Sequence, residues 1–449
     1  MHLSVRLNTY SLTNRPLAMA QLTIALTLVG FGALAPSSRA ETIVVDTIDG
    51  GSETRGLDCT LVDAITAANS DTETGGCIAG DGIDTIDFSV TGTIELESSL
   101  PTITAHLTIE GPGTGSLTIH GMDAYALLDA DTVDLTVNDL TLQAGYRSTG
   151  GCLYAEDATV YLTDVAFVGC STSSGDGGGA ALESTTATLT RVFFQNNDSA
   201  DDGGALEVFV SEVTVSDSTF AGNTAVGDGG AIYGGGVDTT IDIVRSTFSA
   251  NKADGSGGAI SIVSSAVTWS LTSSTVVDNE ADLDASGGHN GGGIKNAGVF
   301  TITNSIVADN TDHSASFHYP NLYSSSSTPT ITSGGRNLIG DNTGISTVFA
   351  AGAPNANLDL VGDSSDPIDP MLRSLTNNGG ATPTHLPDYG SPVLDQGSCG
   401  SETEDQRGVT RPIDLGDHSN ADDGCDIGAV EFDLIFDDGF ESGGPSNWS

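Results

Sequence analysis

The side chains in this 449-residue chain that could do chemistry are mainly carboxylates that precede glycines at regular intervals. Four of them recur near glycine pairs: Asp176, Asp202, Asp228 and Asp254. Carboxylate oxygens are the ligands that Ca²⁺ takes outside cells. If a repeating structure stacks these aspartates at one edge, their like charges cost energy unless cations or salt offset them. Two interpretations stay open, a solvated acidic edge, which is favoured, and specific calcium sites. No cofactor is required.

Three residues are weak candidates for catalysis: Asp202, His289 and Lys295. A polysaccharide lyase needs a base and cations that hold the developing charge, and a glycosidase needs a pair of carboxyl groups. Asp201-Asp202, Gly-His-Asn (288–290) and Ile-Lys (294–295) only approach such motifs. Among sixty acidic residues, two adjacent aspartates are expected by chance. We therefore expect no catalytic residues here.

Two arginines in the repeats, Arg191 and Arg245, alternate with Asp164 and Asp217. Opposite charges at equivalent positions of successive repeats form a ladder of surface ion pairs. We expect these arginines to have this structural role rather than a catalytic one.

The six cysteines are typical of an exported chain with three disulfides, and none forms a CxxC pair for zinc. Fifteen pairings are possible, and proximity in the sequence favours Cys59 with Cys77, Cys152 with Cys170, and Cys399 with Cys425. Each bond would close a short loop and stabilise the fold by about 3 kcal/mol in the chain-entropy model.

The elements that must position these side chains are repeats of about 27 residues. A Phe-x-x-Asn motif recurs, and its members are Phe167 (with Cys170 in place of asparagine), Phe194 with Asn197, Phe220 with Asn223, Phe248 with Asn251, Val276 with Asn279 and Val307 with Asn310. A glycine element keeps step with it as GGCL (150–153), AALE (180–183), GGAL (203–206), GGAI (229–232), GGAI (257–260) and GGGI (291–294). Such a period indicates one coil of a solenoid per repeat.

Apolar residues stand five and seven positions before each phenylalanine, with mostly polar residues between them, as in Val213-Thr214-Val215. This alternation indicates strands with one face inward. We therefore predict an all-β fold, a right-handed, single-stranded parallel β-helix of the pectate-lyase type. The phenylalanines would form an internal stack. The asparagines would form a ladder in which each amide bonds its own turn and the amide one coil away.

One segment, DCTLVDAITAAN (58–69), predicts a helix that caps the N-terminal end of the core. The chain then divides into a signal peptide (1–40), a cap with irregular first coils (41–149), regular coils (150–312), C-terminal coils with a cap (313–433) and a tail (434–449).

Residues 1–40 contain no acid and carry an apolar run (17–35) followed by Ser-Arg-Ala, which predicts cleavage after Ala40. An uncleaved N-terminal anchor is the alternative. The formal net charge of −47 disfavours nucleic acid and anionic membrane surfaces. The tail has neither an apolar span nor a basic cluster, and it serves either as a final strand or in export.

The Phe-x-x-Asn and Gly-Gly-Ala-Ile motifs resemble the repeats of chlamydial polymorphic outer-membrane proteins. The flanking segments are similar to the bacterial choice-of-anchor Q family, in CTLVDAITAAN (59–69), LPTITAHLTIEGPG (100–113), SGGRNLIGDN (333–342), DPMLRSLTNNGGATPTHLPDYGSPVLDQG (369–397) and DQRGVTRP with CDIGAVEF (405–432). The first departs from that family's Cys-Ser-Leu-Arg-Glu-Ala pattern at Thr60, Val62 and Asp63. The resemblance implies an exported β-helix, and it supplies no catalytic residues.

We therefore expect an extracellular or outer-membrane-surface protein with a binding, adhesin-like role. Its partner would be an extracellular glycan or another surface ligand, with no nucleic acid, and the chain would be a monomer that is secreted or held peripherally at the outer membrane. The alternative is a carbohydrate-active enzyme, a lyase or a glycosidase, on the same fold. The sequence identifies neither the ligand nor the means of anchoring.

Overall fold

The structure is a computed structural model that describes residues 41–51, 57–283, 285, 288, 290–315, 318–324 and 330–433. The predicted signal peptide with its cleavage site at Ala40, the tail (434–449) and His289 lie outside the described residues.

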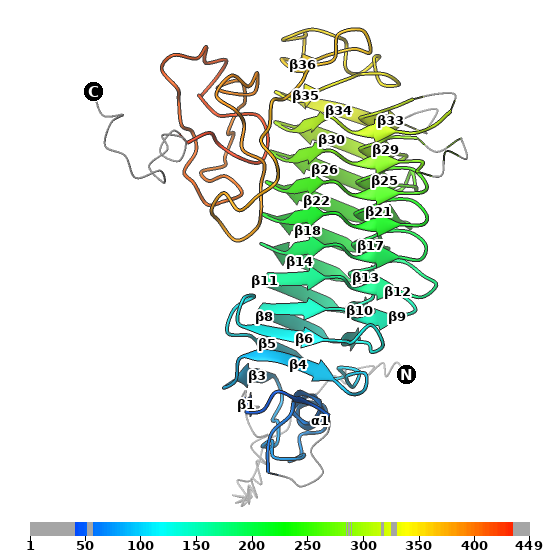
Figure 1. The fold of residues 1–449 in the computed structure, drawn as a ribbon, viewed down its shortest axis with the longest axis vertical. Helices are drawn as coiled ribbons and strands as arrows, with labels where there is room; N and C mark the ends of the chain where they lie inside the picture. The colour runs from blue at the N-terminus through cyan, green and yellow to red at the C-terminus, as the bar shows by residue number, and fades with distance from the viewer. Residues whose placement is uncertain are drawn as a thin grey trace, which may run out of the picture. The chain divides into compact units, whose positions relative to one another are not determined.

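The strands of the described chain form three columns that run up a parallel β-helix (Figure 1). The first column, called here the outer-site sheet, has eight strands: β7 (Leu128–Asp131), β10 (Leu153–Glu156), β13 (Ala180–Glu183), β17 (Leu206–Phe209), β21 (Ile232–Gly235), β25 (Ile260–Ile262), β29 (Ile294–Asn296) and β33 (Leu322–Ser324). The second has seven short strands: β9 (Tyr146–Arg147), β12 (Ser171–Thr172), β16 (Asp198–Ser199), β20 (Thr224–Ala225), β24 (Lys252–Ala253), β28 (Glu280–Ala281) and β32 (Thr311–Asp312). The predicted fold class is confirmed.

The third column contains the remaining strands. They are β1 (Thr42–Val45), β2 (Asp49–Gly50), β3 (Asp84–Phe88), β4 (Gly92–Leu96), β5 (Leu107–Glu110), β6 (Leu117–His120), β8 (Asp134–Gln143), β11 (Thr159–Val168), β14 (Thr186–Thr190), β15 (Phe193–Gln195), β18 (Glu212–Ser216), β19 (Thr219–Ala221), β22 (Thr240–Val244), β23 (Thr247–Ser249), β26 (Thr268–Thr272), β27 (Thr275–Val277), β30 (Val299–Thr303), β31 (Ile306–Ala308), β34 (Thr330–Gly335), β35 (Leu338–Ile339) and β36 (Leu360–Val361). From β14 onward each regular coil contributes two of these strands, whereas β11 is one strand that pairs with both β14 and β15. Strands one coil apart pair in parallel, as β14 does with β18.

The core is built from equivalent residues of successive coils. The rings of Phe167, Phe194, Phe220 and Phe248 stack with centroids 4.6, 4.8 and 4.7 Å apart, and all four side chains are fully buried. These spacings match the distance between paired strands, because each ring comes from one coil. Val276 pairs with Phe248 and continues the stack.

The asparagines lie directly after this stack and form a buried ladder. The Nδ2 of Asn223 donates to Oδ1 of Asn251 (2.8 Å) and to the carbonyl oxygen of Phe194 (3.1 Å). Its own Oδ1 accepts from Nδ2 of Asn197 (2.9 Å). The same arrangement continues through Asn279 and Asn310. Each amide therefore supplies hydrogen bonds at a turn where backbone groups would otherwise be buried without partners.

The structure corrects one register in the glycine element. Ala180 pairs with Leu206, so the residues equivalent to GGAL (203–206) are Gly177–Ala180 and not AALE (180–183). The sequence alone favours AALE because its apolar residues resemble those of the other repeats. The strand pairing shows instead that this coil has a third glycine, Gly179, where the other repeats have their first apolar residue.

Helix α1 (Leu61–Ser70) forms where the sequence predicts it. Its N-cap is Thr60, whose Oγ1 accepts from the backbone N–H of Asp63 (3.2 Å). Leu61, Ala64 and Ile65 are fully buried in the same core as the first strands. The helix thus covers the N-terminal end of the β-helix.

The C-terminal segment (363–433) has almost no regular structure and lies along the outside of the third column (Figure 1). Thr219 on β19 donates from Oγ1 to the carbonyl oxygen of Pro383 (2.7 Å). Thr247 on β23 donates in the same way to Oε1 of Gln406 (2.6 Å). The backbone N–H of Ala429 donates to Oγ1 of Thr275 on β27 (3.2 Å). This segment therefore covers one flank of three successive coils.

The three disulfides pair as predicted: Cys59 with Cys77, Cys152 with Cys170, and Cys399 with Cys425.

Candidate functional site

An acidic edge lies at the turns that lead into the outer-site sheet. The Oδ1 of Asp176 accepts from the backbone N–H of Asp202 (2.8 Å), and Oδ1 of Asp202 accepts from that of Asp228 (2.6 Å). The three aspartates therefore occupy one column, each fixed by a hydrogen bond to the next coil. In each case Oδ1 is the oxygen that positions the turn.

Asp254 does not belong to this column, so that prediction is wrong. Oδ1 of Asp228 accepts instead from the backbone N–H of Ser256 (2.7 Å). Lys252 pairs with Glu280, which places Asp254 beside Asp282. In Asp254-Gly-Ser-Gly-Gly, the aspartate stands two residues before Ser256, which occupies the column position. The sequence pattern therefore assigned Asp254 to this column in error.

Two further side chains, Glu207 and Tyr233, complete the site, and sequence reasoning missed both. Glu207 lies on the outer face of β17. Its column of outward positions also contains Tyr154, Ala181, Tyr233, Ser261, Lys295 and Tyr323. Although it points outward, Glu207 is only 6% exposed, and its Oε2 has no hydrogen-bond partner. In the sequence, the residues of this column directly follow the last residue of each glycine element. The glycine elements could therefore have located the column.

The carboxyl groups of this edge strongly influence one another. Burial, together with the charges of Asp176 and Glu183, raises the pKa of Glu207 to about 8. Burial and the charges of Asp228 and Asp176 raise the pKa of Asp202 to about 6. Such a gathering of perturbed groups at one surface is typical of functional sites.

Tyr233 covers this cluster from the next coil. Burial and the charges of Asp202, Asp176 and Asp228 raise the pKa of its hydroxyl far above the ordinary value. The Tyr233 ring thus reaches back over the acidic turns.

Of the three catalytic candidates, the structure describes Asp202 and Lys295. Nζ of Lys295 lies 2.6 Å from Oδ2 of Asp228, in an ion pair that is about 80% buried. Oδ1 of Asp202 accepts from the backbone N–H of Asp228 (2.6 Å), and His289 lies outside the described residues. Among the described residues, Asp202 and Lys295 therefore have structural partners rather than a free reactive group.

The two predicted arginine pairs are present as well. Arg191 contacts Asp164 (2.6 Å), and Arg245 contacts Asp217 (2.7 Å).

An exposed apolar patch adjoins the acidic edge on the same sheet. Phe209 is 41% exposed and Val263 is 36% exposed, and both flank Gly235. A methyl group added to Gly235 would contact the side chains of Phe209, Val263 and Tyr233 at 3.4 to 3.6 Å. These three side chains therefore surround one shallow position on the outer face.

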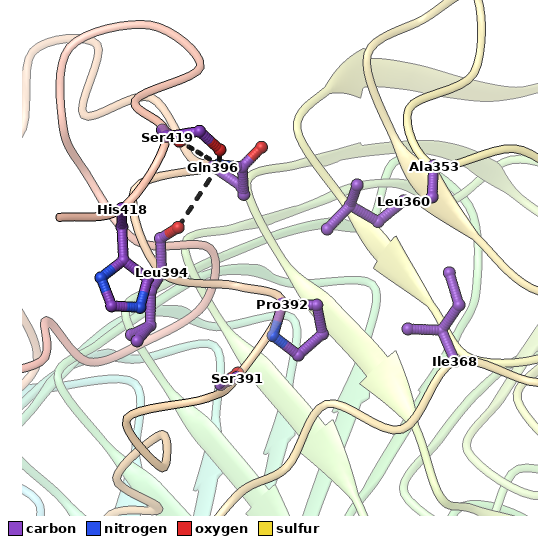
Figure 2. A pocket seen from close by; sticks show the side chains of 9 residues that line it. All are labelled: Ala353, Leu360, Ile368, Ser391, Pro392, Leu394, Gln396, His418 and Ser419. Atoms are coloured by element: carbon purple, nitrogen blue, oxygen red, sulfur yellow. Dashed lines mark hydrogen bonds between the residues drawn. The ribbon is translucent and has the colours of Figure 1, made fainter.

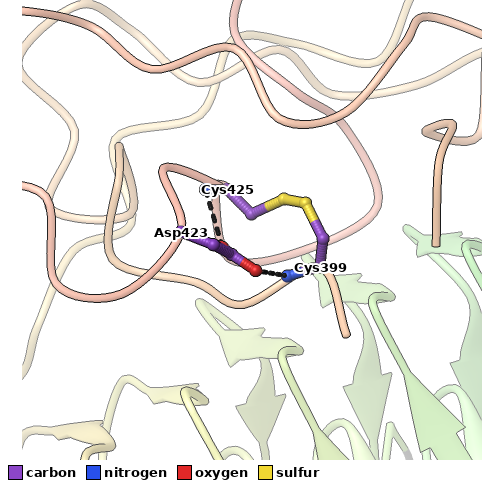
Figure 3. Close-up of side chains that lie close together, drawn as sticks. All are labelled: Cys399, Asp423 and Cys425. Atoms are coloured by element: carbon purple, nitrogen blue, oxygen red, sulfur yellow. Dashed lines mark hydrogen bonds between the residues drawn. A yellow bond between two sulfur atoms is a disulfide. The ribbon is translucent and has the colours of Figure 1, made fainter. Parts of the chain in front are cut away.

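A second group of potential metal ligands, Cys399, Asp423 and Cys425, is structural (Figure 3). The two sulfur atoms form a disulfide and so cannot act as thiolate ligands. The carboxylate of Asp423 accepts from the backbone N–H of Cys399 (3.0 Å) and that of Cys425 (3.2 Å).

A cavity of about 430 Å³ lies between the last coils and the C-terminal segment (Figure 2). Leu360, Ile368 and Leu394 give it apolar walls. The ring nitrogens of His418 contact Asp417 (3.1 Å) and the carbonyl oxygen of Tyr389 (3.1 Å), and Gln396 donates to backbone carbonyl oxygens. The polar groups of this cavity are thus already engaged with protein, and it has no group poised for catalysis among the residues that the structure describes.

Residues 217–235 and 245–263 match the model of the Chlamydia polymorphic membrane protein repeat. The two matches occupy equivalent positions in successive coils, from the corner before β19 to β21 and from the corner before β23 to the residue after β25. No curated protein matches the chain. Within the described residues, no helix has the length and apolar character needed to cross a membrane.

Proposed function

We propose that this protein is an exported, adhesin-like binding protein that recognises an extended neutral glycan on the outer face of the outer-site sheet. The observation that carries the proposal is the composition of that face. Tyr154, Tyr233 and Tyr323 stand in one outward column, and Phe209 and Val263 stand exposed beside it. Aromatic rings that carry a polar group suit sugars, which have apolar faces and hydroxyl edges.

The repeat geometry supports an extended ligand. Equivalent positions recur at the spacing of paired strands, and the three tyrosines of the outward column stand three coils apart, so this face offers aromatic contacts at regular intervals along the β-helix. Many weak contacts of this kind give useful affinity to a long partner.

The C-terminal segment supports the choice of face. It covers the outside of β19, β23 and β27, where Thr219 and Thr247 are fully buried beneath it. The outer-site sheet, by contrast, presents exposed side chains such as Phe209.

The charge supports a neutral partner. With a formal net charge of −47 and the acidic edge beside the aromatic column, the surface repels polyanions, nucleic acid included. The repeat match supports a place at the cell surface, because the matched repeat is that of a polymorphic membrane protein. Secretion through residues 1–40, peripheral attachment at the outer membrane as a monomer, and membership of the choice-of-anchor Q family are parts of the same proposal.

The test is a glycan array probed with the purified protein and two variants. Phe209→Ala is expected to lower the apparent affinity for the bound glycan at least tenfold, because an exposed contact is lost. Tyr161→Ala is the matched control, because Tyr161 is 47% exposed on β11 of another column. Equal binding by both variants would reject this face. New reducing ends after incubation with a polysaccharide panel would replace the binding role with an enzymatic one.

A further inference from the structure

We propose that the acidic edge holds a specific Ca²⁺ site formed by Asp176, Asp201, Asp202 and Glu207. The site would be independent of the glycan-binding role, and its test requires no glycan.

The first observation is the distance between the carboxylates. One oxygen from each of Asp176, Asp201 and Asp202 lies within 4.8 Å of the others. Oxygen ligands of Ca²⁺ lie about 2.3–2.6 Å from the ion, so two of them are at most about 5 Å apart. Three carboxylate oxygens from two coils can therefore bind the same ion.

The second observation is the unpartnered oxygen of Glu207. This side chain is 6% exposed, its Oε2 has no hydrogen-bond partner, and the charge of Asp176 is the strongest that acts on it. A buried carboxyl oxygen without a partner costs free energy that a bound cation would recover. Glu207 would be the fourth ligand, because it reaches the cluster from the sheet side.

The neighbouring groups explain why the site is confined to these two coils. In the next coil, Nζ of Lys295 forms an ion pair with Asp228 and neutralises the charge of that carboxylate. In the following coil Ser256 replaces the aspartate. In the preceding coil the equivalent position is Thr149, since Gly150 and Gly151 hydrogen-bond to Asp176 and Gly177. The unneutralised carboxylates of this column are therefore those of Asp176 and Asp202.

The experiment uses Tb³⁺, a luminescent substitute for Ca²⁺, which is excited through nearby tyrosine rings. Tyr233 stands beside Gly203 and Glu207 on the next coil, so Tb³⁺ at this site should show tyrosine-sensitised emission. We expect Ca²⁺ to displace Tb³⁺ and Mg²⁺ at the same concentration to fail, because Mg²⁺ demands a smaller octahedral site. Glu207→Gln should weaken Tb³⁺ binding at least tenfold. Asp202→Asn should do the same, while its amide oxygen can still accept from the N–H of Asp228.

The matched control is Glu212→Gln, which changes an exposed acid on β18 in the same coil. It should bind Tb³⁺ like the unaltered protein. A parallel measurement compares melting temperatures in CaCl₂ and in NaCl of equal ionic strength, and only CaCl₂ should raise that of the unaltered protein. The site is rejected if Glu207→Gln and Glu212→Gln bind Tb³⁺ equally. It is also rejected if NaCl stabilises as well as CaCl₂, since the effect is then charge screening.

Discussion

The asparagine ladder depends on single side chains that are each bonded in two directions. Asn223 is fully buried, accepts from Asn197, and donates to Asn251 and to the Phe194 carbonyl oxygen. Removal of one amide therefore leaves buried groups unpaired in the coils on both sides.

The first prediction concerns this ladder. Asn223→Ala should lower the free energy of unfolding by about 1–3 kcal/mol, because a buried donor and an acceptor lose their partners. Urea denaturation is the measurement. Asn357→Ala, at an exposed position, is the control and should change stability by less than about 0.5 kcal/mol. Equal stability of the two variants would show that the ladder contributes nothing.

At the scale of elements, the C-terminal segment is held by buried polar groups in place of strands. The Arg411 side chain is fully buried, with Nε 3.0 Å from Oε2 of Glu431 and Nη1 3.3 Å from Oε2 of Glu402. Arg407 and Asp405 form a second buried ion pair (2.8 Å). A segment without regular structure must pair its buried polar groups in this way.

The second prediction follows from the Arg411 pair. Arg411→Met leaves Glu431 as a buried, uncompensated charge and should destabilise the segment by about 3–5 kcal/mol. Hydrogen exchange of residues 390–432 would report it. Arg191→Met is the comparison, because the Arg191–Asp164 pair is 40% and 28% exposed, and it should cost at most about 1 kcal/mol. Adding Glu431→Gln to Arg411→Met should recover part of the loss.

The third prediction concerns pH. His385 is 4% exposed, and its ring nitrogens contact the Arg373 carbonyl oxygen (2.6 Å) and Ser249 Oγ (2.9 Å). Burial lowers the pKa of His385 below its usual value of 6.5, against smaller opposing effects of that carbonyl and of Asp278. The unfolded chain then binds more protons than the folded one just below pH 6.5, so stability falls as the pH falls through this range.

We therefore expect hydrogen exchange of residues 380–390 to accelerate between pH 6.5 and 5, after correction for the intrinsic exchange rate. His385→Gln, which does not titrate, should remove this pH dependence. If the variant keeps it, another group is responsible.

At the scale of the whole molecule, the C-terminal segment contacts a fixed series of coils. Pro383, Gln406 and Ala429 bond to Thr219, Thr247 and Thr275, which stand one coil apart. Coils in a solenoid otherwise interact only with their neighbours, so a coil can be removed without altering the rest.

The fourth prediction compares two deletions of one coil. Deletion of residues 181–206 joins Ala180 to Glu207 and removes one coil, since Ala180 pairs with Leu206. This coil precedes those that hold Thr219, Thr247 and Thr275, so the C-terminal segment should stay packed. Deletion of residues 233–260 removes the coil that holds Thr247 and shifts Thr275, so the segment should detach and become sensitive to limited proteolysis. Equal protease resistance of both proteins would show that the segment does not depend on the number of coils.

The sequence by itself determined the repeating architecture. The period, the alternation in segments such as Val213–Val215, helix α1 and the local disulfides follow from patterns within one coil or between adjacent coils. A stacked fold makes such patterns sufficient, because equivalent residues are neighbours by construction.

Only the tertiary structure decided which side chains share a surface. The exclusion of Asp254 and the inclusion of Glu207 depend on strand register, and a shift of two residues changes which carboxylates meet. The position of residues 363–433 on a flank depends on contacts between residues more than 150 positions apart, such as Thr219 with Pro383. No periodicity encodes such contacts, because the segment is aperiodic and its partners are ordinary outward threonines of the repeats.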